Sequence, residues 1–168
     1  VEFNNINGGS FSTTAVKVNS PILTNTNLLE KIRSKEANLM LDELDIYEDF
    51  KGRVDEARTS LINFLNEQKS DNKKVYGLGA STKGNVLLQY FNIDEKLIEK
   101  IGEVNEDKFG KFTPGSLIPL ISEKELLESD PDYIVVLPWH FRPFFDELKS
   151  LKGKTLVYPL PKFEIVEL

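Results

Sequence analysis

The sequence predicts a doubly wound α/β fold in its second half, built around a mainly parallel sheet of five strands. The first indication is that short apolar runs alternate with helix-forming stretches from Lys74 onward, because repeated β–α units connect parallel strands by right-handed crossovers. The second is the run Tyr133–Leu137, which is as apolar as a strand buried on both faces. The third is Val75–Asn85, VYGLGASTKGN, where an apolar strand enters a glycine-rich turn that opens a helix near Thr82.

The composition excludes several classes of protein. The 168 residues suffice for one domain with a sizeable core and an appended piece. A net charge of −6 without a basic patch argues against a nucleic-acid partner. With no cysteine, disulfides, thiolate zinc sites and thiol catalysis are absent. No apolar run approaches the roughly 20 residues of a membrane helix and no signal-like N-terminus is visible, so we expect a cytoplasmic protein with no membrane partner.

The residues before the α/β domain are expected to form two pieces. Residues 1–18 predict a β-hairpin around Asn7-Gly8-Gly9, since both central positions of an Asn-Gly turn accept a positive φ. An isolated hairpin is marginal in water, so we expect it to belong to a sheet that this chain does not fully contain. Residues 19–73 predict a polar linker followed by a helical spacer.

Two helices are predicted within the spacer. The first covers Leu28–Leu41, with Asn27 and Glu30 as a capping box. The second begins with Asp45 as its N-cap, and its apolar residues recur at spacings of three and four, which places them on one face that we expect to pack in a core. That face is formed by Ile46, Phe50, Val54, Ala57, Leu61 and Leu65.

Residues 74–168 are expected to form the α/β domain. Its five strands are predicted at Val75–Leu78, Ile101–Val104, Leu117–Ile121, Tyr133–Leu137 and Thr155–Tyr158, with Phe163–Val166 as a candidate edge strand. Helices are predicted after the glycine-rich turn, over Asp94–Lys100, from Ser122 with Glu125 as its capping-box partner, and over Phe141–Leu151. Ligands of such open sheets bind beyond the carboxyl ends of the strands.

The glycine-rich turn departs from both familiar phosphate-binding motifs. Gly77 and Gly79 match the start of G-x-G-x-x-G, but the third glycine, Gly84, comes two residues late. Gly79 and Gly84 also have the P-loop spacing, but Asn85 and Val86 stand where Lys and Ser or Thr are required. The missing magnesium-binding hydroxyl argues against ATP hydrolysis.

Polar residues in the same turn still suit an anion. Ser81, Thr82 and Lys83 provide two hydroxyls and a cation at a helix N-terminus, where orphan N–H groups and the helix dipole favour negative charge. The alternative is that the glycines only make a tight turn, that Ser81 or Thr82 caps the helix, and that Lys83 is solvated.

Further segments are expected at the same edge. Asn105, Lys108 and Gly110 follow the second strand, and Thr113–Ser116 leads into the third. The fourth strand is followed by PWHFR at 138–142, which offers a flat surface, a titratable group and a guanidinium for phosphate. Its His140 is the single histidine and the one candidate acid–base catalyst, with a structural residue or helix cap as the alternative.

Three motifs together resemble the C-terminal domain of the sugar C-methyltransferases. They are GLGASTKGNVLLQYFNI at 77–93, NEDKFGKFTPGSLIPLIS at 105–122 and PDYIVVLPWHFR at 131–142. Enzymes of this family methylate a carbon of a nucleotide-linked deoxy-keto sugar with S-adenosylmethionine. His140 stands where the family more often has Asn after the Trp.

The resemblance implies a part of a larger enzyme. Family members have a zinc-binding N-terminal domain, a middle methyltransferase domain that binds S-adenosylmethionine, and a Rossmann-like C-terminal domain that corresponds to residues 74–168. Residues 1–18 resemble the last hairpin of the methyltransferase sheet. The expected partners are therefore a nucleotide-diphosphate sugar and the upstream methyltransferase domain. The chain itself is expected to bind no cofactor and to be inactive alone.

The resemblance also assigns the substrate pocket to the glycine-rich turn, with a rim from the loops after the second and fourth strands. No metal ligand is expected, and His140 is the sole candidate catalytic group. Two alternatives stay open, a stand-alone dinucleotide-binding domain of the NAD type and a structural or dimerisation domain. The predicted substrate-binding residues are Gly77, Gly79, Ser81, Thr82, Lys83, Gly84, Asn85, Asn105, Lys108, Trp139, His140 and Arg142.

Overall fold

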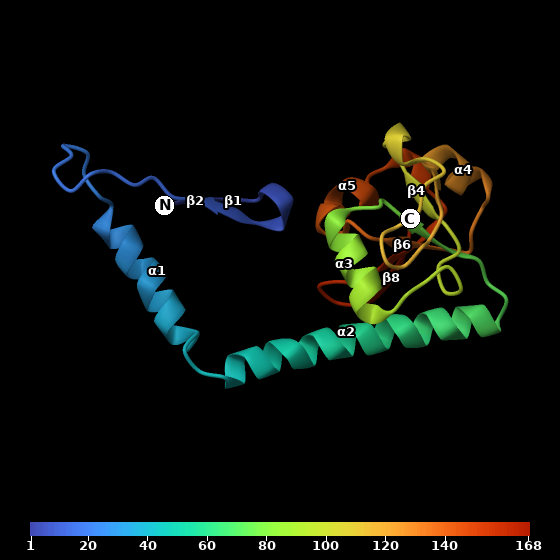
Figure 1. Ribbon diagram of the computed structural model, residues 1–168, viewed down its shortest axis with the longest axis horizontal. Helices are drawn as coiled ribbons and strands as arrows, with labels where there is room; N and C mark the ends of the chain where they lie inside the picture. Colours follow the sequence, from blue (N-terminus) through green and yellow to red (C-terminus); the bar gives the residue numbers. More distant parts are fainter. The chain divides into compact units, whose positions relative to one another are not determined.

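A computed structural model describes the whole chain, Val1–Leu168, as a mixed α/β protein (Figure 1). It divides into two compact units, residues 1–53 and 54–168, and the division falls inside the long helix α2 (Asp45–Ser70). None of the helices combines the length and the apolar character that crossing a membrane requires.

The first unit contains the predicted hairpin. Strands β1 (Glu2–Asn4) and β2 (Ser10–Ser12) pair antiparallel around a 3₁₀ turn, η1 (Ile6–Gly8). Asn7 and Gly8 have φ values of 55° and 84°, as an Asn-Gly turn predicts. The hairpin is therefore confirmed, with strands of only three residues each.

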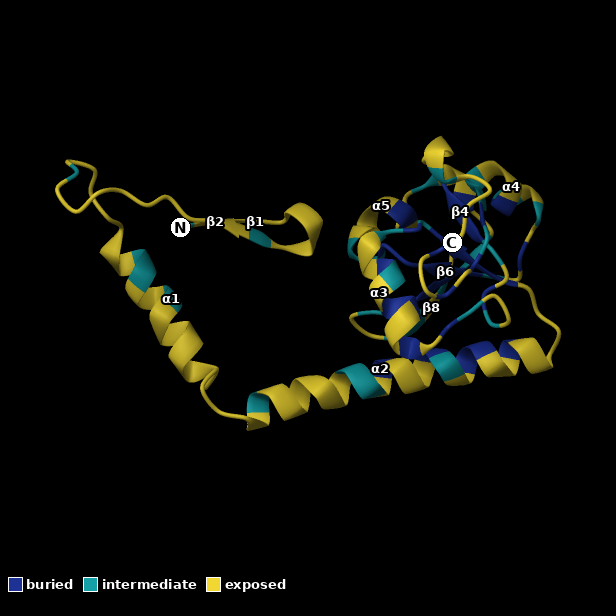
Figure 2. Ribbon diagram, in the orientation of Figure 1, coloured by how far each residue is buried: buried dark blue, intermediate teal, exposed yellow.

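Helix α1 (Thr26–Asn38) follows in the first unit, and its predicted limits were wrong. The side chain of Asn25, not Asn27, accepts the N–H of Leu28 at 3.1 Å, so the helix begins earlier than expected and ends three residues sooner. Not one residue of the first unit is buried, and α1 carries no dark blue in Figure 2.

Helix α2 begins at Asp45 as predicted, but its apolar stripe is buried only in its second half. Ile46 is half-buried and Phe50 is 59% exposed, whereas Leu61 and Leu65 are fully enclosed. Figure 2 shows the buried colour only from the middle of α2 onward. The expected core packing therefore holds for the part of the helix that belongs to the second unit.

The second unit is built on a sheet of six strands, one more than predicted. The candidate edge strand at the C-terminus is real, and it runs antiparallel to its neighbour because its short connection leaves no room for a crossover. The other five strands are parallel. The strands are β3 (Val75–Leu78), β4 (Ile101–Glu103), β5 (Leu120–Ser122), β6 (Tyr133–Val136), β7 (Thr155–Tyr158) and β8 (Glu164–Glu167), in the spatial order β5-β4-β3-β6-β7-β8.

Alternate side chains of each strand enter two different cores. Val75 and Val135 pack with buried residues of α2 and α3 (Thr82–Phe91), while Tyr76 and Ile134 pack with those of α4 (Glu123–Glu128) and α5 (Arg142–Asp146). Because successive strand residues point to opposite faces, helices cover both faces of the sheet.

Two predicted helices were wrong. The segment expected as a helix at 94–100 is a turn, in which the N–H groups of Leu97 and Ile98 both donate to the carbonyl of Asp94, and the Asp94 carboxylate accepts the N–H of Lys96. The predicted helix at 141–151 is divided into η3 (Trp139–Phe141), α5 and η4 (Lys149–Leu151), with Pro143 in the first turn of α5.

Both outer strands of the sheet are protected. Along β5, Leu120 donates to the carbonyl of Lys111 and accepts the N–H of Gly110, so the segment 110–113 covers that edge. The opposite edge is β8, which carries Glu164 and Glu167.

Candidate functional site

The candidate site lies where the carboxyl ends of β3, β4 and β6 meet. The chain winds from β3 to β4 in one direction and to β6 in the other, and this reversal is where open α/β sheets bind ligands. A cavity of about 470 Å³ opens there, and the loops after all three strands contribute to its wall.

The three glycines of the turn are required by close packing. Gly79 has a φ of +79°, and a Cβ atom there would lie 2.8 Å from Pro138 Cγ. A Cβ at Gly77 would lie 2.8 Å from Ile101 Cγ1, and one at Gly84 2.7 Å from Leu137 Cβ. The glycines thus bring the turn and the start of α3 directly against β4 and the end of β6.

Most N–H groups of the turn already donate within the protein. Gly79 N–H donates to the carbonyl of Gly102 at 2.8 Å, Ala80 N–H to Glu103 Oε2 at 3.1 Å, and Ser81 N–H to the carbonyl of Gly79 at 2.8 Å. Ser81 is the N-cap of α3, and its Oγ accepts the N–H of Gly84 at 3.0 Å. Ser81 therefore has the helix-capping role that the alternative interpretation gave it. Thr82 and Lys83, in the first turn of α3, are exposed.

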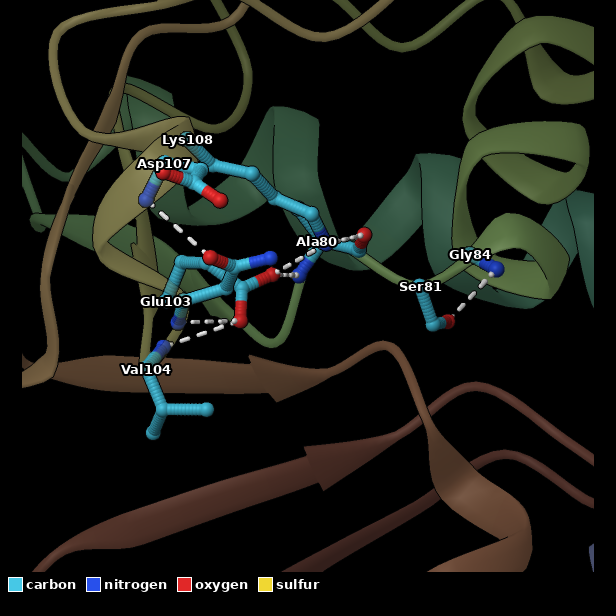
Figure 3. A network of polar contacts seen from close by, with 8 residues as sticks. Ala80, Ser81, Gly84, Glu103, Val104, Asp107 and Lys108 are labelled. Carbon is cyan, nitrogen blue, oxygen red and sulfur yellow. Dashed lines mark hydrogen bonds and ion pairs between the residues drawn. The ribbon is translucent and has the colours of Figure 1, made fainter.

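Glu103 is the central polar residue of this edge, and the sequence reasoning missed it. It ends β4, is 7% exposed, and accepts four hydrogen bonds (Figure 3). Its Oε2 accepts Ala80 N–H at 3.1 Å and Lys108 Nζ at 2.9 Å, and its Oε1 accepts the N–H groups of Val104 and Asn105 at 2.9 and 3.2 Å. The loops after β3 and β4 are thereby tied to one carboxylate.

The charge of Glu103 is stabilised by these partners. Burial raises the pKa of its carboxyl, but the hydrogen bond from Lys108, the two backbone N–H groups and the positive charge of Lys108 together hold that pKa below its usual value. Glu103 is therefore ionised at neutral pH.

The position of Glu103 bears on the dinucleotide alternative. In NAD-binding folds an acidic residue after the second strand binds a ribose hydroxyl. Here the carboxylate is occupied by four donors from its own chain. This arrangement, with the late third glycine, disfavours the NAD-type function.

The loop after β4 places its two predicted residues in structural contacts. The Asn105 side chain caps the 3₁₀ helix η2 (Glu106–Lys108) by accepting Asp107 N–H at 3.0 Å. Lys108 Nζ donates to the carbonyl of Ala80 at 3.0 Å as well as to Glu103, which leaves one of its three N–H groups for another acceptor. Lys108 lines the cavity, whereas Asn105 does not.

Trp139 and His140 lie in η3, directly after β6. Trp139 packs against both cores. His140 Nδ1 is buried and without a hydrogen-bond partner, and so is Oδ1 of Asn85 in α3. Burial and the positive charge of Lys83 lower the pKa of His140, so its imidazole is neutral at pH 7. The effect of Lys83 also places His140 near the start of α3.

Arg142 has partners that favour a structural role over the predicted phosphate contact. Its Nη1 lies 2.7 Å from Glu164 Oε2, its Nε lies 3.1 Å from Asp146 Oδ2, and its guanidinium stacks 4.7 Å from the centre of the Tyr158 ring. These contacts fasten α5 to β7 and β8.

Two findings complete the cavity. Its wall includes Phe141 of the predicted segment 138–142, and also Glu123 and Phe144, which the sequence did not indicate as site residues. The segment 113–116, expected at this edge, lies instead against α3, where Gln89 Nε2 donates to the carbonyl of Pro114 at 3.0 Å. The positions of Glu103 and Phe141 after strands are signals that can be read from the sequence, whereas Glu123 and Phe144 have no such signal.

Comparison with known proteins identifies the class of domain. Residues 5–161 match the family described as the C-methyltransferase C-terminal domain, so the chain belongs to that family. Among individual proteins, the chain is similar to the C-methyltransferase NovU of Streptomyces niveus, with 28% identity over 123 residues. The match covers 71% of this chain and 29% of NovU, so the chain spans less than a third of the length of that relative.

Proposed function

We propose that this chain anchors the substrate of a C-methyltransferase that acts on a nucleotide-diphosphate-linked deoxy-keto sugar. Its family and its similarity to NovU support a role in carbon methylation. The observation that carries the anchoring role is the cavity of about 470 Å³ beside the start of α3, at the point where the strand order of the mainly parallel sheet reverses.

The chemistry of methyl transfer allows substrate binding and catalysis to lie in separate domains. Methylation of carbon needs a nucleophilic carbon beside a ketone, a positioned methyl donor and a base. In this proposal S-adenosylmethionine supplies the methyl group from a domain outside this chain, and a further domain outside it holds zinc. Binding energy gathered on the nucleotide, far from the reacting carbon, orients the sugar toward that donor.

The diphosphate is assigned to the first turn of α3. Thr82 and Lys83 are exposed there, and the positive end of the helix favours an anion. His140 lies near Lys83 and has a buried Nδ1 without a partner. Asn85 follows in α3 with a buried Oδ1 that has no hydrogen-bond partner, and Trp139 precedes His140 in η3. Gly77, Gly79 and Gly84 serve the site by bringing the turn close to the strand ends, as Ser81 does by capping α3.

The upstream methyltransferase domain is the second proposed partner. The first unit has no buried residue, and Phe3 and Phe11 of its hairpin are 64% and 69% exposed. Apolar side chains exposed in this number are typical of surfaces covered in a larger assembly. Alone, the chain is proposed to be inactive, and its compartment is proposed to be the cytoplasm.

Titration calorimetry of the chain with UDP-glucose and thymidine-diphosphate glucose tests the anchoring role. We expect binding to at least one of them, weakened about tenfold by Lys83→Ala, which corresponds to about 1.4 kcal/mol. Lys124→Ala is the control, since its side chain is 83% exposed on α4. A folded chain that binds neither sugar nucleotide contradicts the proposal. Binding of NADH, followed by its fluorescence, supports the dinucleotide alternative instead.

A further inference from the structure

The wall of the cavity is unfavourable for phosphate. It includes the carboxylates of Glu103 and Glu123, and its one lysine, Lys108, is already paired with Glu103. These three side chains together carry one negative charge. A diphosphate placed inside would meet like charge, which disfavours it there.

Glu123 differs from Glu103 in having no partner. It is the first residue of α4 and half-buried, and its carboxylate makes no hydrogen bond or ion pair within the chain. Burial and the negative charge of Glu103 raise the pKa of its carboxyl. Its oxygens are not among the fully buried, unpartnered atoms, so this carboxylate is open to a ligand, and a hydrogen bond to a charged acceptor at a partly desolvated position is stronger than one in open water.

The remainder of the wall is apolar and aromatic. Phe141 and Phe144 are 45% and 60% exposed, and Pro138 lies beside them in the same wall. Exposed aromatic faces stack on flat rings, as they do in nucleic-acid-binding proteins. The cavity therefore combines a surface for a planar ring with an unpaired acceptor and the remaining N–H of Lys108.

We infer that this cavity takes the nucleoside end of the substrate, with the base against Phe144 and a hydroxyl or ring N–H donating to Glu123. The diphosphate then lies outside the acidic wall, toward Thr82 and Lys83. The volume of about 470 Å³ is within the usual range for small-molecule sites. This inference rests on the proposed function. It assigns the nucleoside of the substrate to the cavity and the diphosphate to the first turn of α3.

Calorimetry with two kinds of probe tests the inference. Thymidine diphosphate and UDP carry a nucleoside, whereas inorganic pyrophosphate carries only the anionic part. We expect Glu123→Ala and Phe144→Ala each to weaken the binding of the preferred nucleoside diphosphate about tenfold, while pyrophosphate binding stays within twofold of the unmodified chain. Glu123→Gln provides a second variant of nearly unchanged volume.

Matched controls exist for both positions. Glu128→Ala removes a carboxylate from the same helix, where it is 67% exposed, and Phe112→Ala removes a phenylalanine that is 59% exposed but outside the cavity. Neither control should change binding of either probe.

The outcomes separate the two proposals. If pyrophosphate and both nucleoside diphosphates fail to bind the folded chain, the anchoring function itself fails. If a nucleoside diphosphate binds but the Glu123 and Phe144 variants bind it normally, or lose pyrophosphate equally, the anchoring function stands and the assignment of the cavity is overturned.

Discussion

Lys108 Nζ lies 2.9 Å from Glu103 Oε2 and joins the loop after β4 to the glycine-rich turn, because the same ammonium also donates to the carbonyl of Ala80 at 3.0 Å. The carboxylate is 8% exposed in its side chain, and the lysine is 39% exposed. This pair ties the glycine-rich turn to the loop after β4.

Replacing Lys108 by Met should destabilise the fold. The buried carboxylate would lose its charged partner, which we expect to cost about 2 kcal/mol of the free energy of unfolding. Urea unfolding measures this loss. Lys124→Met, at a side chain 83% exposed, should change the stability by less than about 0.5 kcal/mol. Equal stabilities of the two variants would show that the Lys108–Glu103 pair does not stabilise the fold.

The stabilisation from Glu103 should disappear in acid. The pKa of this carboxyl is lowered in the folded state, so its contribution is present above the unfolded value near 4.5 and is lost as the pH falls through the folded value. The stability difference between the unmodified chain and Lys108→Met should therefore shrink below about pH 4.5. A difference that stays constant down to acid unfolding would contradict this assignment.

Glu123→Gln should have the opposite effect on stability. The pKa of Glu123 is raised in the folded state, so the ionised form destabilises the fold as the pH rises through that folded value. The variant should be more stable than the unmodified chain at pH 7. The difference in stability between the two should disappear as the pH falls toward 4.5, the pKa of this carboxyl in the unfolded chain. Unfolding curves at several pH values decide this. A residue that weakens the fold while strengthening binding is characteristic of a functional site.

Gly79→Ala and Gly52→Ala should change stability in opposite directions. Alanine at 79 would combine a φ of +79° with a Cβ atom 2.8 Å from Pro138, and we expect a loss of about 2 kcal/mol. At Gly52, inside α2, an added Cβ meets nothing within 4 Å, so alanine should gain about 0.5 to 1 kcal/mol. Thermal unfolding of both variants provides the comparison, and a tolerated Gly79→Ala would refute the packing argument.

Arg142→Met tests the role that the structure gives this residue. Loss of its contacts to Glu164, Asp146 and the Tyr158 ring should cost about 1 kcal/mol of stability. Binding of a nucleoside diphosphate should be unchanged. Weakened binding with unchanged stability would instead restore the phosphate contact predicted from the sequence.

The sequence was informative where local chemistry decides the structure. Strand β3 and the start of α3 were predicted correctly because an apolar run, glycines and the Ser81 cap all act within eleven residues. The cap of α4 at Ser122 was predicted for the same reason, and its Oγ accepts the N–H of Glu125 at 3.0 Å.

Residues that depend on long-range contacts were not predictable in this way. Glu103 and Arg142 look alike in the sequence as charged residues near strand ends, yet one is enclosed among donors of two loops and the other is bound across three elements. Glu123 reaches the cavity only because α4 begins beside the end of β4. Each of these depends on pairing between strands that are distant in the chain.

The protected outer strands have a consequence for how the second unit behaves at high concentration. On one side Gly110 and Lys111 already occupy the outward N–H and carbonyl of Leu120 in β5, and on the other the exposed carboxylate of Glu167 in β8 repels an approaching copy of the same strand. Copies of this unit are therefore hindered from stacking their sheets edge to edge, the route by which exposed strands nucleate fibrils.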